Sequence, residues 1–406
     1  MKGEAPRAVV QEIMAEFARL TGLFPGGVSP RRYLWTDAFA VCNFLGLYRE
    51  TGEELFRDEA FRLVEQVHRV LGRHRQDDGR KGWISGLGEQ EGALHPACGG
   101  LRIGKRLNER GEDDPFDEPL EWDRDGQYYH YLTKWMHALN RVTRVTGSWS
   151  YHRWALELAK AAHAAFVYQP APGGPKRMYW KMSIDLSYPL VPSMGLHDPL
   201  DGLITYTQLQ ATAAEDPEGR AAPLAREIAD MAALCEGRSW ATDDPLGTGG
   251  LLSDAFRVAQ LMGRGFFSGH LLSLLVESAL PGLESFEKGD SLRLPAGRRL
   301  AFRELGLSIG LRAAERLTEL VRGQGDVFGT AEGLNRQMAA VRGYGELAGR
   351  IERFWLRPEQ QAVGTWKDHR EINMVMLATS LSPDGYLTLQ GLMPAASETD
   401  RSRPGG

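Results

Sequence analysis

The sequence has 406 residues, of which 42% are hydrophobic, 25% charged and 9% aromatic, and this composition excludes a disordered or fibrous chain. Its 48 Lys and Arg residues against 53 Asp and Glu residues give a net charge of −5, without the basic excess typical of a nucleic-acid-binding protein. Nucleic acid is therefore not expected as a partner.

Three further features bear on the compartment. The longest apolar stretches, such as 271–280, are far shorter than the roughly 20 residues that cross a bilayer. The first 20 residues are typical of an amphipathic helix and not of a secretory signal. The three cysteines, Cys42, Cys98 and Cys235, lie far apart and form no Cys-x-x-Cys pair. We expect a cytoplasmic protein without a membrane partner, a cofactor or a metal site, and no pattern specifies an oligomeric state.

Hydrophobic periodicity predicts helices along nearly the whole chain. In chain order they cover residues 6–21, 33–51, 53–74, 127–147, 149–168, 199–214, 221–237, 250–283, 299–322, 332–356 and 368–380. The segment 250–283 divides at Gly263-Arg264-Gly265, which gives about a dozen helices. Because strand-like alternation is scarce, the sequence predicts an all-α fold.

An internal repeat indicates how these helices are paired. Residues 33–68 align with 128–163, and the alignment matches Thr51-Gly52 with Thr146-Gly147 and His68 with His163. A glycine that tolerates positive φ ends the first helix of each copy, and the second helix returns antiparallel. A weaker third hairpin follows at 199–237. We interpret the two equivalent histidines as structural residues of outer helices.

The leading helix of each hairpin is apolar around most of its circumference, with Trp35, Phe39 and Phe44 in the first copy, whereas the following helix has a solvated stripe. About twelve helices in these alternating roles resemble the (α/α)6 toroid of the six-hairpin glycosidases and the N-acylglucosamine 2-epimerase group. The resemblance implies one toroid domain over residues 1–396. The segment 397–406 has few apolar residues and is expected to be a mobile tail.

In such a ring, the starts of the inner helices gather at one mouth. The long segments 75–126 and 169–198 precede inner helices, so we expect them to border a functional pocket there. The candidate catalytic residues at or near these helix starts are Asp37, His130, Asp185, His197, Asp201, His369 and Glu371. The candidate substrate-binding residues, chosen for aromatic faces or charge, are Trp35, Tyr129, Tyr179, Trp180, Lys181 and Trp366.

Several of these residues also have a plain structural interpretation. Asp37 lies in an apolar helix and could form an ion pair with Arg31 or Arg32. Lys181 could pair with a surface acid. Asp198 and Asp244 each precede a proline, which favours helix capping for both.

The favoured function is that of a carbohydrate-active enzyme that hydrolyses a glycoside with two carboxyl groups drawn from Asp37, Asp185, Asp201 and Glu371. The alternative chemistry is epimerisation or isomerisation of a sugar by His130, His197 or His369. Lyase chemistry also stays open. A non-catalytic helical scaffold that binds a protein is the alternative from a different class.

Overall fold

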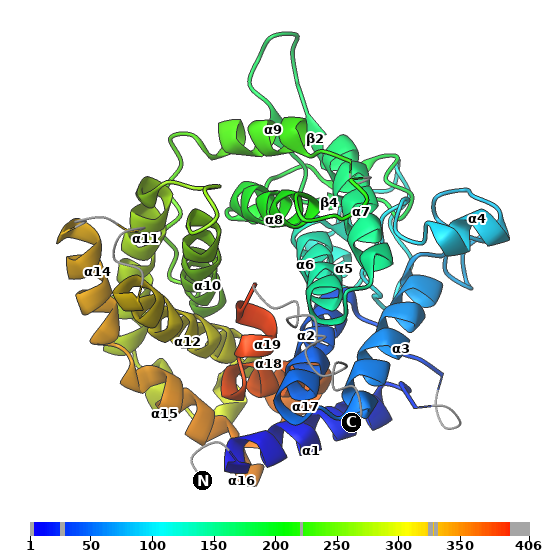
Figure 1. The fold of residues 1–406 in the computed structure, drawn as a ribbon. Helices are drawn as coiled ribbons and strands as arrows, with labels where there is room; N and C mark the ends of the chain where they lie inside the picture. The colour runs from blue at the N-terminus through cyan, green and yellow to red at the C-terminus, as the bar shows by residue number, and fades with distance from the viewer. Residues whose placement is uncertain (1–3, 25–28, 220–221, 324–327, 329–331, 390–406) are drawn as a thin grey trace, which may run out of the picture.

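Six helices form a closed inner ring. The computed structural model describes residues 4–24, 29–219, 222–323, 328 and 332–389. Each inner helix packs against the next, and the last returns to the first (Figure 1). The inner helices in ring order are α2 (Leu34–Thr51), α6 (Tyr129–Thr146), α8 (Asp198–Ala213), α10 (Pro245–Met262), α12 (Ala301–Gly323) and α18 (Arg370–Leu381). The ring closure and the (α/α)6 architecture expected from the repeat are confirmed.

An outer layer of helices surrounds this ring, one or two against each inner helix (Figure 1). These are α3 (Glu54–Leu71), α7 (Trp149–Phe166), α9 (Ala225–Cys235), α11 (Gly269–Lys288), α14 (Glu332–Arg342) with α15 (Glu346–Trp355), and α1 (Glu4–Leu20). The first helix, α1, packs on the last inner helix, α18, so the two ends of the helical array complete the sixth hairpin. Among the described helices, none combines the length and apolar character needed to cross a bilayer.

The helix ends follow the sequence signals. Gly52 and Gly147 end α2 and α6 with φ of 72° and 74°, and their amides donate to the carbonyls of Tyr48 and Thr143. Both glycines therefore act as the left-handed caps that the repeat predicts. Asp244 caps α10, accepting from the amides of the next turn.

Two expectations about helix boundaries were wrong. Asp198 is not a cap, because it lies inside the first turn of α8 and His197 precedes the helix there without a side-chain capping bond. The predicted helix 332–356 is two helices, α14 and α15, separated at residues 343–345. Gly343 and Gly345 flank this break, and glycine weakens a helix interior.

The second long segment forms a small sheet with the two residues that precede α6. The strand β1 (Gln127–Tyr128) pairs antiparallel with β4 (Lys181–Met182), which pairs antiparallel with β5 (Pro189–Val191). A second ladder joins β2 (Val167–Tyr168) and β3 (Arg177–Met178), and the register places Tyr128 opposite Lys181. The short helices α4 (Glu89–Leu94) and α5 (Glu118–Glu121) lie in the first segment.

The opposite end of the ring is filled by the last described part of the chain. Helix α19 (Asp384–Leu387) packs against α2, α6, α10 and α18 and lies inside the ring in Figure 1. The remaining short helices are η1 (Ser291–Arg293), η2 (Ala296–Arg298), α16 (Pro358–Gln361) and α17 (Gly364–Asp368). The ring is thus open at one mouth and closed at its base. The tail predicted at 397–406 lies outside the described residues.

Candidate functional site

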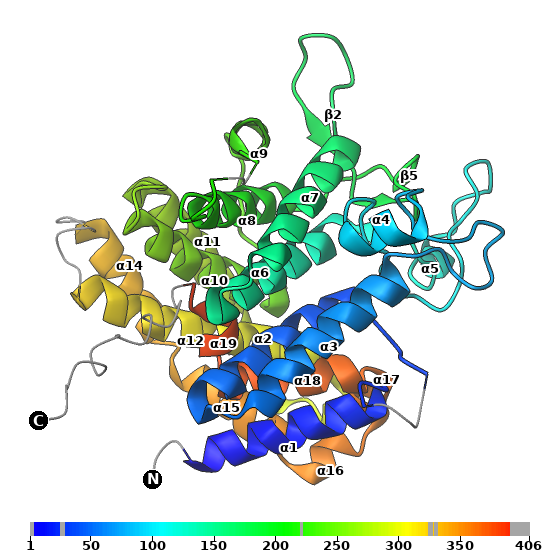
Figure 2. The same cartoon turned by 45° about the vertical axis from the view of Figure 1, so that its right-hand side comes forward.

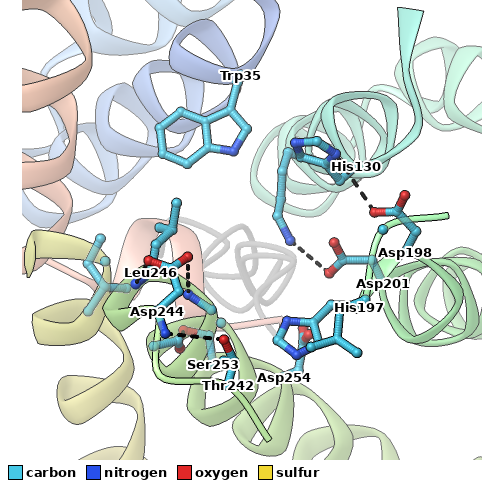
Figure 3. A pocket seen from close by; sticks show the side chains of 18 of the residues that line it. Trp35, His130, His197, Asp198, Asp201, Thr242, Asp244, Leu246, Ser253 and Asp254 are labelled. Atoms are coloured by element: carbon cyan, nitrogen blue, oxygen red, sulfur yellow. Dashed lines mark hydrogen bonds and ion pairs between the residues drawn. The ribbon is translucent and has the colours of Figure 1, made fainter. Parts of the chain in front are cut away.

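A cavity of about 320 Å³ opens at the mouth of the ring (Figure 3). All six inner helices contribute to its wall, as do α19 and the segment that precedes α8. The aromatic, charged and histidine side chains that line it include Trp35, His130, Lys134, Trp180, His197, Asp198, Asp201, Asp244, Asp254 and Tyr386. Residues more than 300 positions apart in the sequence therefore meet around one space.

An aspartate on the first turn of α8 is the electrostatic centre of the cavity. Asp201 Oδ1 lies 2.9 Å from Lys134 Nζ, and both side chains are largely buried. Burial alone would raise the pKa of Asp201, but the Lys134 ammonium outweighs it, and the pKa stays below its usual value. Asp201 is therefore a permanent negative charge in the wall at neutral pH.

Burial and this charge raise the pKa of two neighbouring carboxyl groups. Burial, together with the charge of Asp201, raises the pKa of Asp198 to about 8. Burial and the same charge also raise the pKa of Asp254, although Arg257 donates to Asp254 Oδ1 over 3.0 Å. The site thus holds one ionised carboxylate, Asp201, and beside it a carboxyl group, Asp198, that can donate a proton.

Two histidines from different elements face the same cavity. His130 Nδ1 lies 3.7 Å from Asp198 Oδ1, and burial lowers the pKa of His130 to about 4, so its imidazole is neutral at pH 7. His197 Nε2 lies 2.8 Å from the carbonyl oxygen of Trp240. Because a carbonyl can only accept, Nε2 of His197 is a donor, and in the neutral form of the ring Nδ1 is the acceptor.

Aromatic rings form two sides of the cavity. Trp35 contacts Phe39 with ring centroids 4.5 Å apart, and Phe39 stacks on Tyr386 from the base of the ring at the same separation. Trp180 stands on the side of the small sheet. Flat apolar faces beside carboxyl groups are the arrangement that binds the apolar face of a sugar ring and its hydroxyls.

Five of the residues singled out from the sequence come together at this cavity. They are Trp35, His130, Trp180, His197 and Asp201. The other eight lie elsewhere, and the structure gives each a partner.

The predicted acids outside the cavity wall form ion pairs. Asp37 is buried 3.4 Å from Arg32, as the structural interpretation anticipated, and it accepts from the amide of Tyr33. Asp185 lies 2.8 Å from Arg80.

Glu371 lies 2.9 Å from Arg31, and His369 packs edge-on against Phe302 on the same side of the molecule. Both residues stand at the start of α18, but neither lines the cavity.

The remaining predicted binding residues belong to the core or to the sheet. The Tyr129 hydroxyl donates to that of Tyr206 over 2.9 Å, and Tyr179 stacks on Tyr168. Trp366 stacks on Trp355. Lys181 is fully buried and bonds to Glu121, so its partner is a buried acid and not the surface acid expected.

Sequence reasoning missed Lys134, Asp254 and Tyr386 and favoured helix capping over catalysis for Asp198. Lys134 follows His130 by four residues, which places both on one face of α6. Asp254 and Arg257 are charged residues inside an otherwise apolar inner helix. A search for charges within the buried helices, in addition to their starts, would have found these residues.

The comparisons with known proteins bear on the fold. No family model and no curated protein matches this sequence. An alpha-mannanase from Bacteroides thetaiotaomicron superposes with a TM-score of 0.54 at 8% identity, covering 93% of this chain and 96% of the mannanase. An alpha-1,6-mannanase of Salegentibacter, in complex with alpha-1,6-mannotriose, superposes with a TM-score of 0.51 at 11% identity. The match covers 95% of this chain and 100% of that mannanase.

A sugar epimerase from a ruminal bacterium gives a TM-score of 0.50 at 10% identity, covering 94% of this chain and 98% of that enzyme. Hydrolases and an epimerase thus share one architecture with this chain, and at these identities the likeness is one of fold. The chain has the (α/α)6 toroid fold of the six-hairpin glycosidase-like enzymes.

Proposed function

We propose that this protein is a carbohydrate-active enzyme that hydrolyses a glycosidic bond in the central cavity. The observation that carries the proposal is the contrast between Asp198, whose pKa is raised to about 8, and Asp201, whose pKa is lowered, in one aromatic-walled pocket. Glycoside hydrolysis needs one protonated and one ionised carboxyl group, and adjacent environments that separate two pKa values supply both.

The roles follow from the protonation states. Asp198 donates its proton to the glycosidic oxygen as the bond to the anomeric carbon breaks. The ionised Asp201 faces the positive charge that develops on the sugar and acts on water or on the anomeric carbon. Lys134 keeps Asp201 ionised throughout, and Trp35 and Trp180 hold the apolar faces of the sugar.

The test is to assay Asp198→Asn and Asp201→Asn against a panel of oligosaccharides, measuring new reducing ends. Loss of a positioned acid or carboxylate is expected to lower kcat about 100- to 10,000-fold. Glu371→Gln, which breaks an ion pair outside the cavity, is the matched control and should keep full activity. Full activity in Asp198→Asn would overturn the proposal, and the stereochemistry of the first product distinguishes inversion from retention.

Epimerisation is the second candidate, because His130 and His197 both line the cavity and the Trp240 carbonyl holds His197 through Nε2. This reaction removes a proton next to the sugar carbonyl and returns it to the opposite face. Incubation of a reducing sugar in D2O tests it: epimerisation exchanges deuterium into the sugar without releasing a new reducing end. His197→Asn should then abolish exchange, whereas under the hydrolysis proposal the wild type shows no exchange.

A further inference from the structure

An exposed tryptophan continues the aromatic wall of the cavity outward. Trp122, directly after α5, has 49% of its surface exposed. Its ring contacts Trp180 edge-on, with centroids 5.5 Å apart and planes at 78°. Since Trp180 lines the cavity, the two rings form one aromatic path from the cavity to solvent. Figure 2 shows α4, α5 and β5 gathered in one projecting part of the molecule.

The backbone beneath Trp122 is held by a buried ion pair. Lys181 Nζ, fully buried, lies 2.6 Å from the Glu121 carboxylate and also donates to the carbonyls of Glu121 and Arg124 at 2.9 Å. The side chain of Asp117 caps α5 by accepting from the Leu120 amide over 2.9 Å. These bonds fix the residues on both sides of Trp122 to strand β4, which begins directly after Trp180. The exposed ring is therefore positioned in advance of any ligand.

A fixed, exposed tryptophan that adjoins a sugar-sized cavity has the chemistry of a second sugar-binding position. An indole face covers the apolar CH side of a pyranose, and such a face outside the cavity reaches only a sugar unit that extends beyond it. Tyr128 also packs against Trp180, with ring centroids 5.3 Å apart.

We infer that Trp122 forms an outer subsite and that the substrate is an uncharged oligosaccharide of at least two sugar units. The inference rests on the proposed function, since it assigns the substrate class of the same site. The first unit occupies the central cavity beside Asp198 and Asp201, and the second lies against Trp122.

The charge of the surrounding loop determines which oligosaccharides fit. Residues 111–123 contain seven acidic residues and no lysine or arginine. Six of these acids are exposed, namely Glu112, Asp113, Asp114, Asp117, Glu118 and Asp123, and Glu121 is the buried partner of Lys181. Anionic sugars such as uronates are repelled by this rim, whereas a neutral chain is not.

The experiment measures binding of neutral sugars by calorimetry to the full-length wild type and to Trp122→Ala. The test ligands are alpha-1,6-linked manno-oligosaccharides and cello-oligosaccharides of one to four units, with oligogalacturonates as the anionic set. The wild type should bind di- and trisaccharides tighter than the monosaccharide, and oligogalacturonates weakest. Trp122→Ala should weaken disaccharide binding about 5-fold, leave monosaccharide binding unchanged, and be partly rescued in Trp122→Phe.

Leu55→Ala, which trims a 55% exposed leucine on the outer helix α3, is the control and should change nothing. If Trp122→Ala binds all lengths as the wild type does, or loses monosaccharide and disaccharide binding equally, the outer subsite is wrong while the proposed function stands. If the wild type binds none of the sugars, both proposals fail. Circular dichroism and the Tm of each variant separate these results from misfolding.

Discussion

The mouth and the base of the ring both bury polar side chains of the same helix, yet they use them differently. At the mouth, His130 and Lys134 of α6 face a cavity, where His130 lies beside Asp198 and Lys134 pairs with Asp201 of α8. Two turns further, His137 Nε2 lies 2.9 Å from the carbonyl of Tyr386, and Arg141 Nε donates to the carbonyl of Gly385 over 3.1 Å. At the mouth these polar groups therefore line a cavity that a ligand can enter, whereas at the base they bind the main chain.

These residues belong to one polar stripe along α6, with spacings of three and four residues. The stripe consists of His130, Lys134, His137, Arg141 and Arg144. It meets a matching stripe on α8, where Arg144 Nε donates to Thr212 and Gln208 lies 3.0 Å from His137. The comparison shows that polar side chains inside the ring can bind a ligand only where no backbone segment already occupies their hydrogen-bonding groups.

The largest expected effect is at the mouth, in Lys134→Met. The change leaves Asp201 buried without its cation, so its pKa should rise and the ionised carboxylate should be lost at neutral pH. We expect activity to fall at least about 100-fold and the free energy of unfolding to fall by about 3–5 kcal/mol.

Activity assays and urea denaturation check this result. The control is Lys160→Met on α7, which removes an ion pair to Glu227 whose lysine is 42% exposed, and it should change stability by less than about 1 kcal/mol. If Lys134→Met and Lys160→Met reduced activity and stability equally, the Lys134–Asp201 pair would be no more important than an ordinary surface ion pair.

At the base, Gly385→Ala should displace α19. A Cβ atom at Gly385 would lie 2.3 Å from the carbonyl oxygen of Cys42, a distance that the backbone cannot accommodate without moving. We expect a loss of about 1–3 kcal/mol of stability and weaker sugar binding, since Tyr386 of the same helix lines the cavity.

Thermal unfolding and calorimetric titration measure the two effects. Gly333→Ala on α14, where an added Cβ meets nothing within 4 Å, is the matched substitution and should be neutral or slightly stabilising. Unchanged stability in Gly385→Ala would mean that α19 does not close the base tightly.

The smallest expected effect is a pH dependence of the free energy of unfolding, caused by Asp198 and His130 at the mouth. The folded-state pKa of Asp198 is about 8 against an ordinary value of 3.8, so the folded protein binds the proton more tightly. Its contribution to stability is therefore present below pH 4 and is lost as pH rises toward 8. His130, with a pKa of about 4, acts in the opposite direction, but only below about pH 6.5.

Between pH 6.5 and 8, we expect the wild type to lose about 1–2 kcal/mol of stability relative to Asp198→Asn. Urea denaturation of both proteins across this range makes the comparison. Parallel pH profiles would contradict the raised pKa of Asp198, and activity should likewise decline above about pH 8 as the acid loses its proton.

The architecture was predictable because it repeats. The aromatic helix, Thr-Gly turn and half-exposed helix recur, and the structure confirms the caps at Gly52 and Gly147 and the closed ring. Of the two long segments expected to border the cavity, 169–198 does so through Trp180 and His197, whereas 75–126 contributes no residue to its lining. The closure of the base by α19 had no sequence signal of its own.

The site was only partly predictable, for two physical reasons. Along β4 and its approach, neighbouring side chains point to opposite sides, so Trp180 reaches the cavity while Tyr179 and Lys181 contact Tyr168 and Glu121. The sequence analysis considered residues at helix starts, which include His130 and Asp201. Asp254 was missed because it lies in the third turn of α10. Which charges are paired across the ring depends on contacts between helices far apart in sequence.

The pairing of α1 with α18 also constrains how the protein is made. Arg370 of α18 bonds Glu16 of α1 over 2.9 Å across 354 residues of chain. During synthesis, α1 therefore leaves the ribosome long before α18 is made. Its apolar face cannot pack against α18 until almost the entire chain has been translated. Ring closure is a late, long-range step, because the loop entropy of the intervening chain opposes the contact until the other hairpins have formed.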